Sequence, residues 1–382
     1  MPSSESPPSV QSPTPDADQS TTSDAGPSAT ADANQGDSAR GSASLRNIGV
    51  SLLLSLLVLG VIAYFTFDAA AFREVVGHLR PLLLLSAVGI AFARIGLNGW
   101  RLSYVSQGRL SLRSGTRGQL AWDFFSSVTP SIVGGGPIAA FYVARDQNIP
   151  VGESAAFMFF CILLDQLWFV VAIPLLIVAN LYVDLLPAAA GAVGLWGLMA
   201  YFGVLLAWAT VHAYATLFRP RLLLRLARWC VKWPYLRWAR TRVMEEVRSY
   251  VGRARTLGTQ SPSFYVNGFL LTGLSWGARY GLVVLIVRSV YANVDALSLL
   301  FRSAAMMLVG LIMPTPGGSG GVEGLYALFI GPLIPASLVA PTLLTWRLLS
   351  YYLFIALGAY LFMHQLRDRS SSASPAPSQS SS

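Results

Sequence analysis

The chain has little charge for its length. Of its 382 residues only 12% are Asp, Glu, Lys or Arg, whereas 54% are hydrophobic. A soluble domain of ordinary composition carries roughly 25% charged residues. The polar side chains are therefore too few to cover a water-facing globule, and the composition predicts a protein that crosses a membrane several times.

Cysteine and histidine are scarce as well. The 2 cysteines exclude a disulfide framework, and the 3 histidines are too scattered to suggest a metal cluster. The sequence also contains no Walker A motif and no H-E-x-x-H. We therefore expect no cofactor, no metal and no ATP-driven pump, while enzymatic activity stays open.

The formal charge of +9 is distributed unevenly. Residues 1–40 hold six acidic residues and one base, Arg40, and the remaining bases are arginines apart from Lys232. These arginines cluster between apolar segments, which is typical of cytoplasmic loops under the positive-inside rule and not of nucleic-acid binding. We therefore expect an inner (cell) membrane location, cytoplasmic termini and no nucleic-acid partner.

Six apolar segments are long enough to cross a bilayer, which takes about 20 helical residues. They are residues 47–67, 82–104, 154–182, 188–213, 264–288 and 338–363. Ser/Pro-rich tails at 1–44 and 370–382 flank them, and we expect both tails to be disordered. The predicted fold class is all-α, with one polytopic transmembrane domain over residues 45–369.

Two further apolar stretches are interrupted by Pro and Gly. Residues 119–144 break at Thr129-Pro130 and at 134–137, and residues 297–334 break at 314–318 and 320–321. Each leaves half-helices too short to cross, so we interpret both stretches as re-entrant helical hairpins. This interpretation places most basic loop residues on the inside, namely Arg101, Arg109, Arg113, Arg117, Arg145 and the basic run 219–258.

The two halves of the chain repeat one another. Ala93-Arg94-Ile95-Gly96 recurs as Ala278-Arg279-Tyr280-Gly281, and the Thr-Pro and Gly-Gly pairs of the breaks recur in nearly the same register. Asp165 falls opposite Arg347 if a short gap is allowed. An odd number of crossings separates the units 82–182 and 264–363, so the second is inverted, a plan typical of transporters whose substrate site lies at broken helices.

Ionisable residues remain in or beside the apolar segments, where each costs at least ~2.5 kcal/mol on insertion scales. They are Arg94, Asp123, Asp165, Arg279, Arg302, Glu323 and Arg347. A guanidinium binds phosphate through two hydrogen bonds, and Glu323 is suited to an ammonium group or a proton. The alternatives are structural pairing of the charges and close helix packing at the glycines.

The second break carries a recognisable motif. Residues 316–323 read Pro-Gly-Gly-x-Gly-x-x-Glu, which resembles the signature of the lysylphosphatidylglycerol synthase transmembrane-region family, also called flippase-like domain proteins. Thr129-Pro130, Gly134-Gly135, Arg145 and Leu163-Leu164-Asp165 resemble its first half, and the likeness covers residues 45–365. The resemblance implies a polytopic inner-membrane protein that moves an aminoacylated or otherwise modified lipid between leaflets, although some relatives are linked to sugar transfer from a lipid carrier.

The resemblance and the charges together nominate substrate-binding residues. These are Arg94, Arg145, Asp165, Arg279, Pro316, Gly317, Gly318, Gly320, Glu323 and Arg347. The sequence departs from the family pattern at two positions. Pro137 stands where relatives often carry an acidic residue, and Gln166 stands where they often carry a basic one, so the resemblance does not identify the headgroup. We also expect no lysyl-lipid synthesis, since no aminoacyl-transferase domain follows residue 365.

Three functions remain open. The leading hypothesis is a lipid translocator acting on a membrane phospholipid or a polyprenyl-linked lipid. The second is a membrane glycosyltransferase or its accessory, using Asp123, Asp165 or Glu323 on a lipid-linked sugar. The third is a non-transporting scaffold recruited through residues 219–258, which we expect to form amphipathic pieces divided at Pro234 on an anionic lipid surface. The sequence does not predict an oligomeric state.

Overall fold

The computed structural model describes residues 79–129, 135–183, 185, 191–218, 225, 240–315 and 317–361, together with Gly60 and Tyr64. Helices joined by short loops make up these residues, and no strand occurs among them. The predicted all-α fold class is confirmed. Both tails, Pro234, Pro316 and nearly all of the predicted span 47–67 lie outside the described residues.

The first half consists of a long helix, two short helices and another long helix. They are α3 (Pro81–Ser106), α4 (Leu112–Val128), α5 (Gly136–Gln147) and α6 (Val151–Ala179). Ser111 begins α4 by accepting a hydrogen bond from the N–H of Ser114. The predicted break is confirmed, because α4 ends at Val128 and α5 begins at Gly136.

The second half has the same order of elements. It contains α10 (Pro262–Val290), α11 (Ala296–Gly310), α12 (Gly321–Phe329), the turn η3 (Gly331–Leu333) and α13 (Ala336–Arg347), which continues through the π-helical turn η4 (Leu348–Tyr352). Asp295 caps α11 by accepting the N–H of Ser298 at 2.7 Å. The second predicted break is also confirmed, since residues 311–320 separate α11 from α12.

Two further helices follow the first half. They are α7 (Gly191–Ala213), extended by the π-helical turn η1 (Tyr214–Phe218), and α9 (Arg240–Gly258). The helix α7 covers the predicted span 188–213, and α9 covers the second part of the predicted basic arm. Val251, Ala254 and Leu257 of α9 are buried whereas Arg248 and Arg255 are exposed, so α9 is amphipathic.

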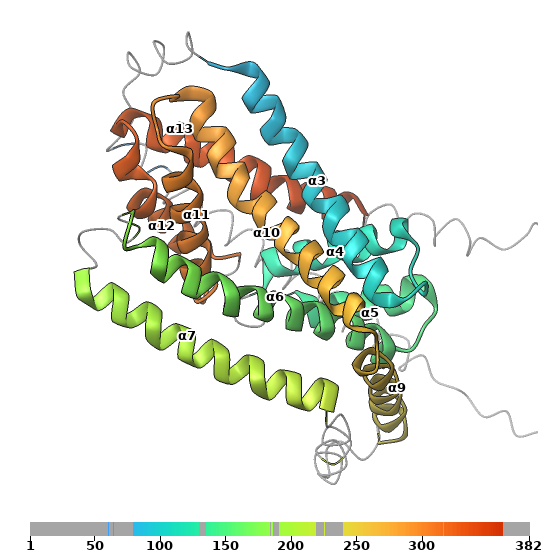
Figure 1. Ribbon diagram of the computed structural model, residues 1–382. Helices are drawn as coiled ribbons and strands as arrows, with labels where there is room; N and C mark the ends of the chain where they lie inside the picture. Colours follow the sequence, from blue (N-terminus) through green and yellow to red (C-terminus); the bar gives the residue numbers. More distant parts are fainter. Residues whose placement is uncertain are drawn as a thin grey trace, which may run out of the picture. The chain divides into compact units, whose positions relative to one another are not determined.

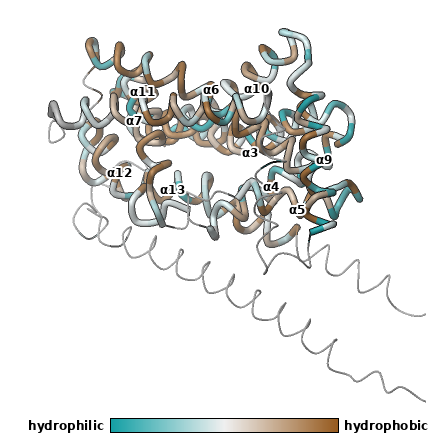
Figure 2. Tube along the Cα trace, turned by 90° about the horizontal axis from the view of Figure 1, so that it is seen from below, coloured by the Kyte–Doolittle hydropathy of each residue, from teal (hydrophilic) through white to brown (hydrophobic). Residues whose placement is uncertain are grey.

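Four helices in the described part are long and apolar enough to cross a membrane: α3, α6, α10 and the continuous helix Ala336–Leu361. Figure 2 shows hydrophobic residues predominating along the helices, with hydrophilic residues concentrated around α9. The total number of spans, the re-entrant course of the short helices and the domain boundaries stay predictions.

The helices α3 and α10 lie side by side and run antiparallel (Figure 1). The N–H of Arg80, where α3 begins, donates to the carbonyl of Ser289, where α10 ends, at 2.8 Å. Further along, Ser275 Oγ lies 2.8 Å from Asn98 Oδ1. Continuing this register by about one turn places Arg94 opposite Arg279, the two arginines of the repeated motif. An inverted repeat requires this antiparallel arrangement, although the repeat itself stays a prediction.

Several arginines that the sequence assigned to cytoplasmic loops lie within helices, and Arg145 of α5 is one of them. Arg101 was assigned to a cytoplasmic loop, but it lies within α3 and is only 4% exposed. Arg113 and Arg117 likewise lie within a helix, α4. Arg101 is accommodated because Asp165 of α6 supplies its counter-charge.

Candidate functional site

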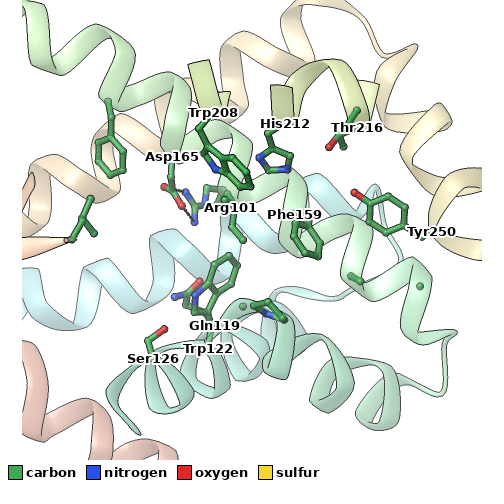
Figure 3. Close-up of a pocket in the computed structure, with 18 of the residues that line it drawn as sticks. Arg101, Gln119, Trp122, Ser126, Phe159, Asp165, Trp208, His212, Thr216 and Tyr250 are labelled. Carbon is green, nitrogen blue, oxygen red and sulfur yellow. Dashed lines mark hydrogen bonds and ion pairs between the residues drawn. The ribbon is translucent and has the colours of Figure 1, made fainter. Parts of the chain in front are cut away.

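A cavity of about 970 Å³ lies among α3, α4, α5, α6, α7, α9 and α10. Its walls are largely apolar and aromatic, with Trp122, Phe159, Trp208 and Tyr250 lining the space (Figure 3). The lining side chains of α6 run from Val151 to Phe169, which is about 27 Å at roughly 1.5 Å per residue. A few polar groups in mostly apolar walls are typical of a ligand site.

A bidentate ion pair stands at the cavity wall. Arg101 Nη1 lies 2.5 Å from Asp165 Oδ1, and Arg101 Nη2 lies 3.4 Å from Oδ2 (Figure 3). The indole N–H of Trp276 donates to the same carboxylate at 2.9 Å. The sequence predicted Asp165 but missed Arg101. The missed signal was its spacing of two helical turns from Arg94, which puts both arginines on one face of α3.

A second ion pair joins α3 to α4. Arg94 Nη2 lies 3.2 Å from Asp123 Oδ2, and the Arg94 guanidinium stacks 3.9 Å from the centre of the Phe354 ring. Asp123 lines the cavity, whereas Arg94 is 7% exposed and lies behind it. Arg94 therefore influences the cavity through Asp123.

Arg279 is a cation of the cavity for which the described residues supply no acidic partner. Its guanidinium lies 4.6 Å from the centre of the Trp276 ring and within electrostatic range of Arg94. Within the described ranges, no carboxylate forms an ion pair with Arg279. The cavity thus offers a positive charge that an anionic ligand can neutralise.

The Pro-Gly-Gly motif builds a different cluster. Gly317, Gly318 and Gly320 have φ values of 60°, 68° and 85°, the left-handed region that glycine adopts without strain. The loop lets the Gly320 N–H donate to Glu323 Oε2 at 2.7 Å, and Arg347 Nη2 lies 2.7 Å from the same oxygen. Glu323 is 0% exposed. These residues are not part of the cavity lining, so the motif here serves to cap α12 and to form a buried ion pair.

The other predicted substrate residues are divided between the surface and the interior. Arg145 is exposed in the last turn of α5 and does not line the cavity. Arg302, from the wider set of charges, is 9% exposed and donates to the carbonyl of Phe329 at 3.2 Å. Of the nominated residues, Asp165 and Arg279 line the cavity. The binding roles of all of them stay predictions.

The helix α9 contributes cavity residues that the sequence did not suggest. Glu246 and Tyr250 line the cavity, and Glu246 Oε2 accepts the N–H of Gly152 at 2.7 Å, so α9 is held against the start of α6. Burial raises the pKa of the Tyr250 phenol, which keeps this ring neutral. The sequence did not predict these residues as cavity residues, because they lie in a strongly basic run that is typical of a helix on a membrane surface.

The side chain of Arg253 also holds α9 in place. Arg253 donates to the carbonyl of Ser106, lies 3.9 Å from Glu153 and stacks on the Phe157 ring. Burial lowers the pKa of Arg253, while Glu153 acts in the opposite direction. Because Ser106 ends α3 and Glu153 begins α6, Arg253 ties α9 to both helices.

These observations define a helical membrane protein with a largely apolar cavity among its helices, bordered by a few charged side chains. The family described as the lysylphosphatidylglycerol synthase TM region matches residues 50–358, and the chain belongs to this family. The chain is also similar to a UPF0104 membrane protein of Archaeoglobus fulgidus, with 23% identity over 315 residues that cover 81% of this chain and 94% of the relative. No solved structure matches the chain. The resemblance inferred from the Pro-Gly-Gly motif is confirmed.

Proposed function

We propose that this protein binds a polar lipid headgroup in the cavity and moves the lipid between leaflets. The observation that carries this proposal is Arg279, a cavity cation for which the described residues supply no acidic partner. Phosphate is the anion that membrane lipids present, and a guanidinium binds it with two parallel hydrogen bonds. The apolar and aromatic walls suit the part of the headgroup that adjoins the acyl chains.

The placement of α7 supports a route for the acyl chains. Trp208 and Val211 line the cavity and are 59% and 60% exposed, so this wall has little protein behind it. It is held to α6 by a hydrogen bond of 2.8 Å between His212 Nδ1 and Gln166 Oε1. A headgroup can occupy the cavity beside α7 while its chains stay in the surrounding lipid.

The three carboxylates that the sequence suggested for sugar transfer are Asp123, Asp165 and Glu323, and none of them is well placed to act as a general base. A general base needs an accessible carboxylate near the reacting group. Both oxygens of Asp165 are engaged by Arg101, Asp123 is paired with Arg94, and Glu323 is 0% exposed outside the cavity lining. We therefore place translocation ahead of sugar transfer by these three residues.

A leaflet-resolved assay tests the proposal. The protein is reconstituted in vesicles that contain an acyl-chain-labelled phospholipid, and a membrane-impermeant quencher is added outside. We expect wild-type protein to expose inner-leaflet label, and Arg279→Gln to slow this exposure at least about tenfold, because hydrogen bonds to a charged group contribute roughly 1.5–3 kcal/mol. Arg255→Gln is the matched control, since Arg255 is exposed and does not line the cavity.

Two results would contradict the proposal. The first is exposure in wild-type vesicles that is no faster than in protein-free vesicles. The second is an equal loss in Arg279→Gln and Arg255→Gln, which would mean that removing any arginine charge impairs the protein.

A further inference from the structure

One indole connects two charged groups of the cavity. Trp276 of α10 is buried and lines the cavity. Its N–H donates to Asp165 Oδ1 of α6 at 2.9 Å. The guanidinium of Arg279, one helical turn later on α10, lies over the same ring, 4.6 Å from its centre. Trp276 therefore contacts both the carboxylate of the cavity wall and the cation for which the described residues supply no acidic partner.

Two contacts hold the Trp276 ring in one orientation. The indole N–H lies in the plane of the ring, so the hydrogen bond to Asp165 uses the ring edge and leaves the ring faces for other contacts. The Phe169 ring meets Trp276 edge to face, with centres 4.7 Å apart and an angle of 72° between the planes. A buried ring with a fixed hydrogen bond and a fixed neighbour has little rotamer freedom, and so it is a rigid support for a stacked cation.

The acceptor of the indole N–H is fixed in turn. Arg101 of α3 contacts both oxygens of Asp165, at 2.5 and 3.4 Å (Figure 3). A bidentate guanidinium holds a carboxylate in one geometry. The contacts therefore run from α3 through α6 to α10, in the order Arg101, Asp165, Trp276 and Arg279.

The last member of this series keeps its hydrogen-bonding capacity. In the described part of the chain, the Nε atom of Arg279 is buried and has no hydrogen-bond partner. A guanidinium that stacks on a ring uses its face, so the N–H groups in its plane stay available for an anion. Holding a long side chain in one rotamer also reduces the entropy that is lost when a ligand binds.

We propose that Trp276 is a positioning residue for Arg279, and that Asp165 acts on the ligand through Trp276 and not by direct contact. In the proposed function, on which this inference rests, Arg279 binds the phosphate of the lipid. Trp276 keeps the guanidinium at the cavity with its N–H groups open to that phosphate. The Arg101–Asp165 pair then supports the binding group and is not itself the binding group.

Two lipids that differ only in their phosphate test the inference. The probes are phosphatidic acid and diacylglycerol with identical acyl chains, and their binding to the purified full-length protein is titrated by native mass spectrometry. We expect Trp276→Leu to weaken phosphatidic acid binding about fivefold, the size of a cation–π contact at a partly desolvated site. Diacylglycerol binding should not change. Equal weakening for both lipids would overturn the inference, because the indole would then contribute only apolar wall.

A tryptophan on the neighbouring helix provides the matched control. Trp168 of α6 also donates its indole N–H to a side chain, Tyr280 Oη at 3.4 Å, but it does not line the cavity. We expect Trp168→Leu to leave phosphatidic acid binding unchanged. An equal loss in Trp168→Leu and Trp276→Leu would overturn the inference, since any indole of this region would then have the same effect.

A double variant tests whether Trp276 acts through Arg279. If it does, Trp276→Leu/Arg279→Gln binds phosphatidic acid no more weakly than Arg279→Gln alone, because the group that Trp276 positions is already gone. A further loss of about fivefold in the double variant, equal to the loss in Trp276→Leu alone, would overturn the inference.

Conservative variants separate positioning from charge. Trp276→Phe keeps a ring face and loses the indole N–H, so we expect phosphatidic acid binding between that of wild type and Trp276→Leu. Asp165→Asn keeps an acceptor for the indole N–H and removes the charge, so we expect binding within about twofold of wild type. A loss in Asp165→Asn as large as in Trp276→Leu would overturn the inference, because the carboxylate charge itself would then be required.

The same titrations distinguish the two proposals. Equal binding of phosphatidic acid and diacylglycerol to the wild-type protein would refute the phosphate contact of the proposed function. A preference for phosphatidic acid that depends on Arg279 but survives Trp276→Leu would refute this inference alone.

Discussion

The two halves of the molecule use their buried charges differently. The cavity pair, Arg101 and Asp165, stands at the cavity wall, and the Asp165 side chain is 19% exposed. The buried pair, Arg347 and Glu323, lies outside the cavity lining, with side chains 5% and 0% exposed. The two ion pairs thus have different surroundings. Arg101 and Asp165 join the long helices α3 and α6, whereas Glu323 lies in the first turn of α12, and of the two pairs the first borders the described cavity.

The two halves also differ at one position of the predicted repeat. In the register of the repeat, Pro137 stands where the second half has Glu323. Among the described residues, the start of α5 has no counterpart of the Glu323–Arg347 pair, and Gly136 and Pro137 line the cavity. In the predicted register, a proline beside the cavity thus corresponds to a glutamate held in a buried ion pair.

Removing one member of the buried pair gives the largest expected effect. Arg347→Met leaves Glu323 as an uncompensated buried carboxylate, which costs about 3–5 kcal/mol. We expect a marked fall in the thermal unfolding temperature of the detergent-solubilised protein. The double variant Glu323→Gln/Arg347→Met should recover much of this loss. If Arg347→Met is as stable as wild type, the Glu323–Arg347 pair is not more important for stability than the cavity pair.

The corresponding change in the cavity pair should destabilise less. Asp165→Asn retains an acceptor for the Trp276 indole and leaves Arg101 near Thr272 Oγ1, at 3.3 Å. Since the site also borders an open cavity, we expect a loss of about 1–3 kcal/mol. Unfolding in the same detergent provides the comparison. A loss equal to that of Arg347→Met would show that both pairs are mainly structural.

Substitutions at two glycines should have smaller effects on stability, and they test how closely α9 packs against α6. A Cβ at Gly152 would collide with the Glu246 carbonyl, whereas a Cβ at Gly96 would meet no atom within 4 Å. We expect Gly152→Ala to cost about 1–3 kcal/mol by separating α9 from α6. Gly96→Ala should be neutral or stabilising by up to about 1 kcal/mol. Thermal unfolding of both variants measures this, and equal effects would contradict the close approach of α9.

The smallest expected effect lies outside both pairs, at the exposed cap of α11. The hydrogen bond with Ser298 holds the pKa of Asp295 below its usual range. Because the folded-state pKa is lowered, the stabilisation is present above the unfolded-state pKa and is lost as the pH falls through the folded-state value. We expect Asp295→Asn, which still caps the helix, to reduce slightly the loss of unfolding temperature on acidification. An identical pH profile would contradict this role.

Much of the fold could be predicted from runs of apolar residues and from residues that break helices. Runs of apolar residues located α3, α6 and α10 within a few residues, and the Pro and Gly clusters located both helix breaks. The repeat also singled out Arg94 and Arg279, which the antiparallel register of α3 and α10 places opposite each other. These features depend on local sequence or on regular helix geometry.

The cavity was harder to predict, because tertiary packing creates it. Loop counting misplaced Arg101, since its partner Asp165 is 64 residues away in sequence. Glu246 and Tyr250 became cavity residues only through the docking of α9 at Gly152. The family motif drew attention to Glu323, whose immediate surroundings are a helix cap and an arginine rather than the cavity.

Photo-crosslinking tests the central claim most directly. The full-length protein is reconstituted in vesicles with a phospholipid that carries a photoactivatable group in its headgroup, and labelled peptides are identified by mass spectrometry. The account predicts label within 151–169 and 246–250, displaced by excess unlabelled phospholipid and reduced in Arg279→Gln. Label confined to 317–323 and 347–351, with none in the cavity segments, would contradict it.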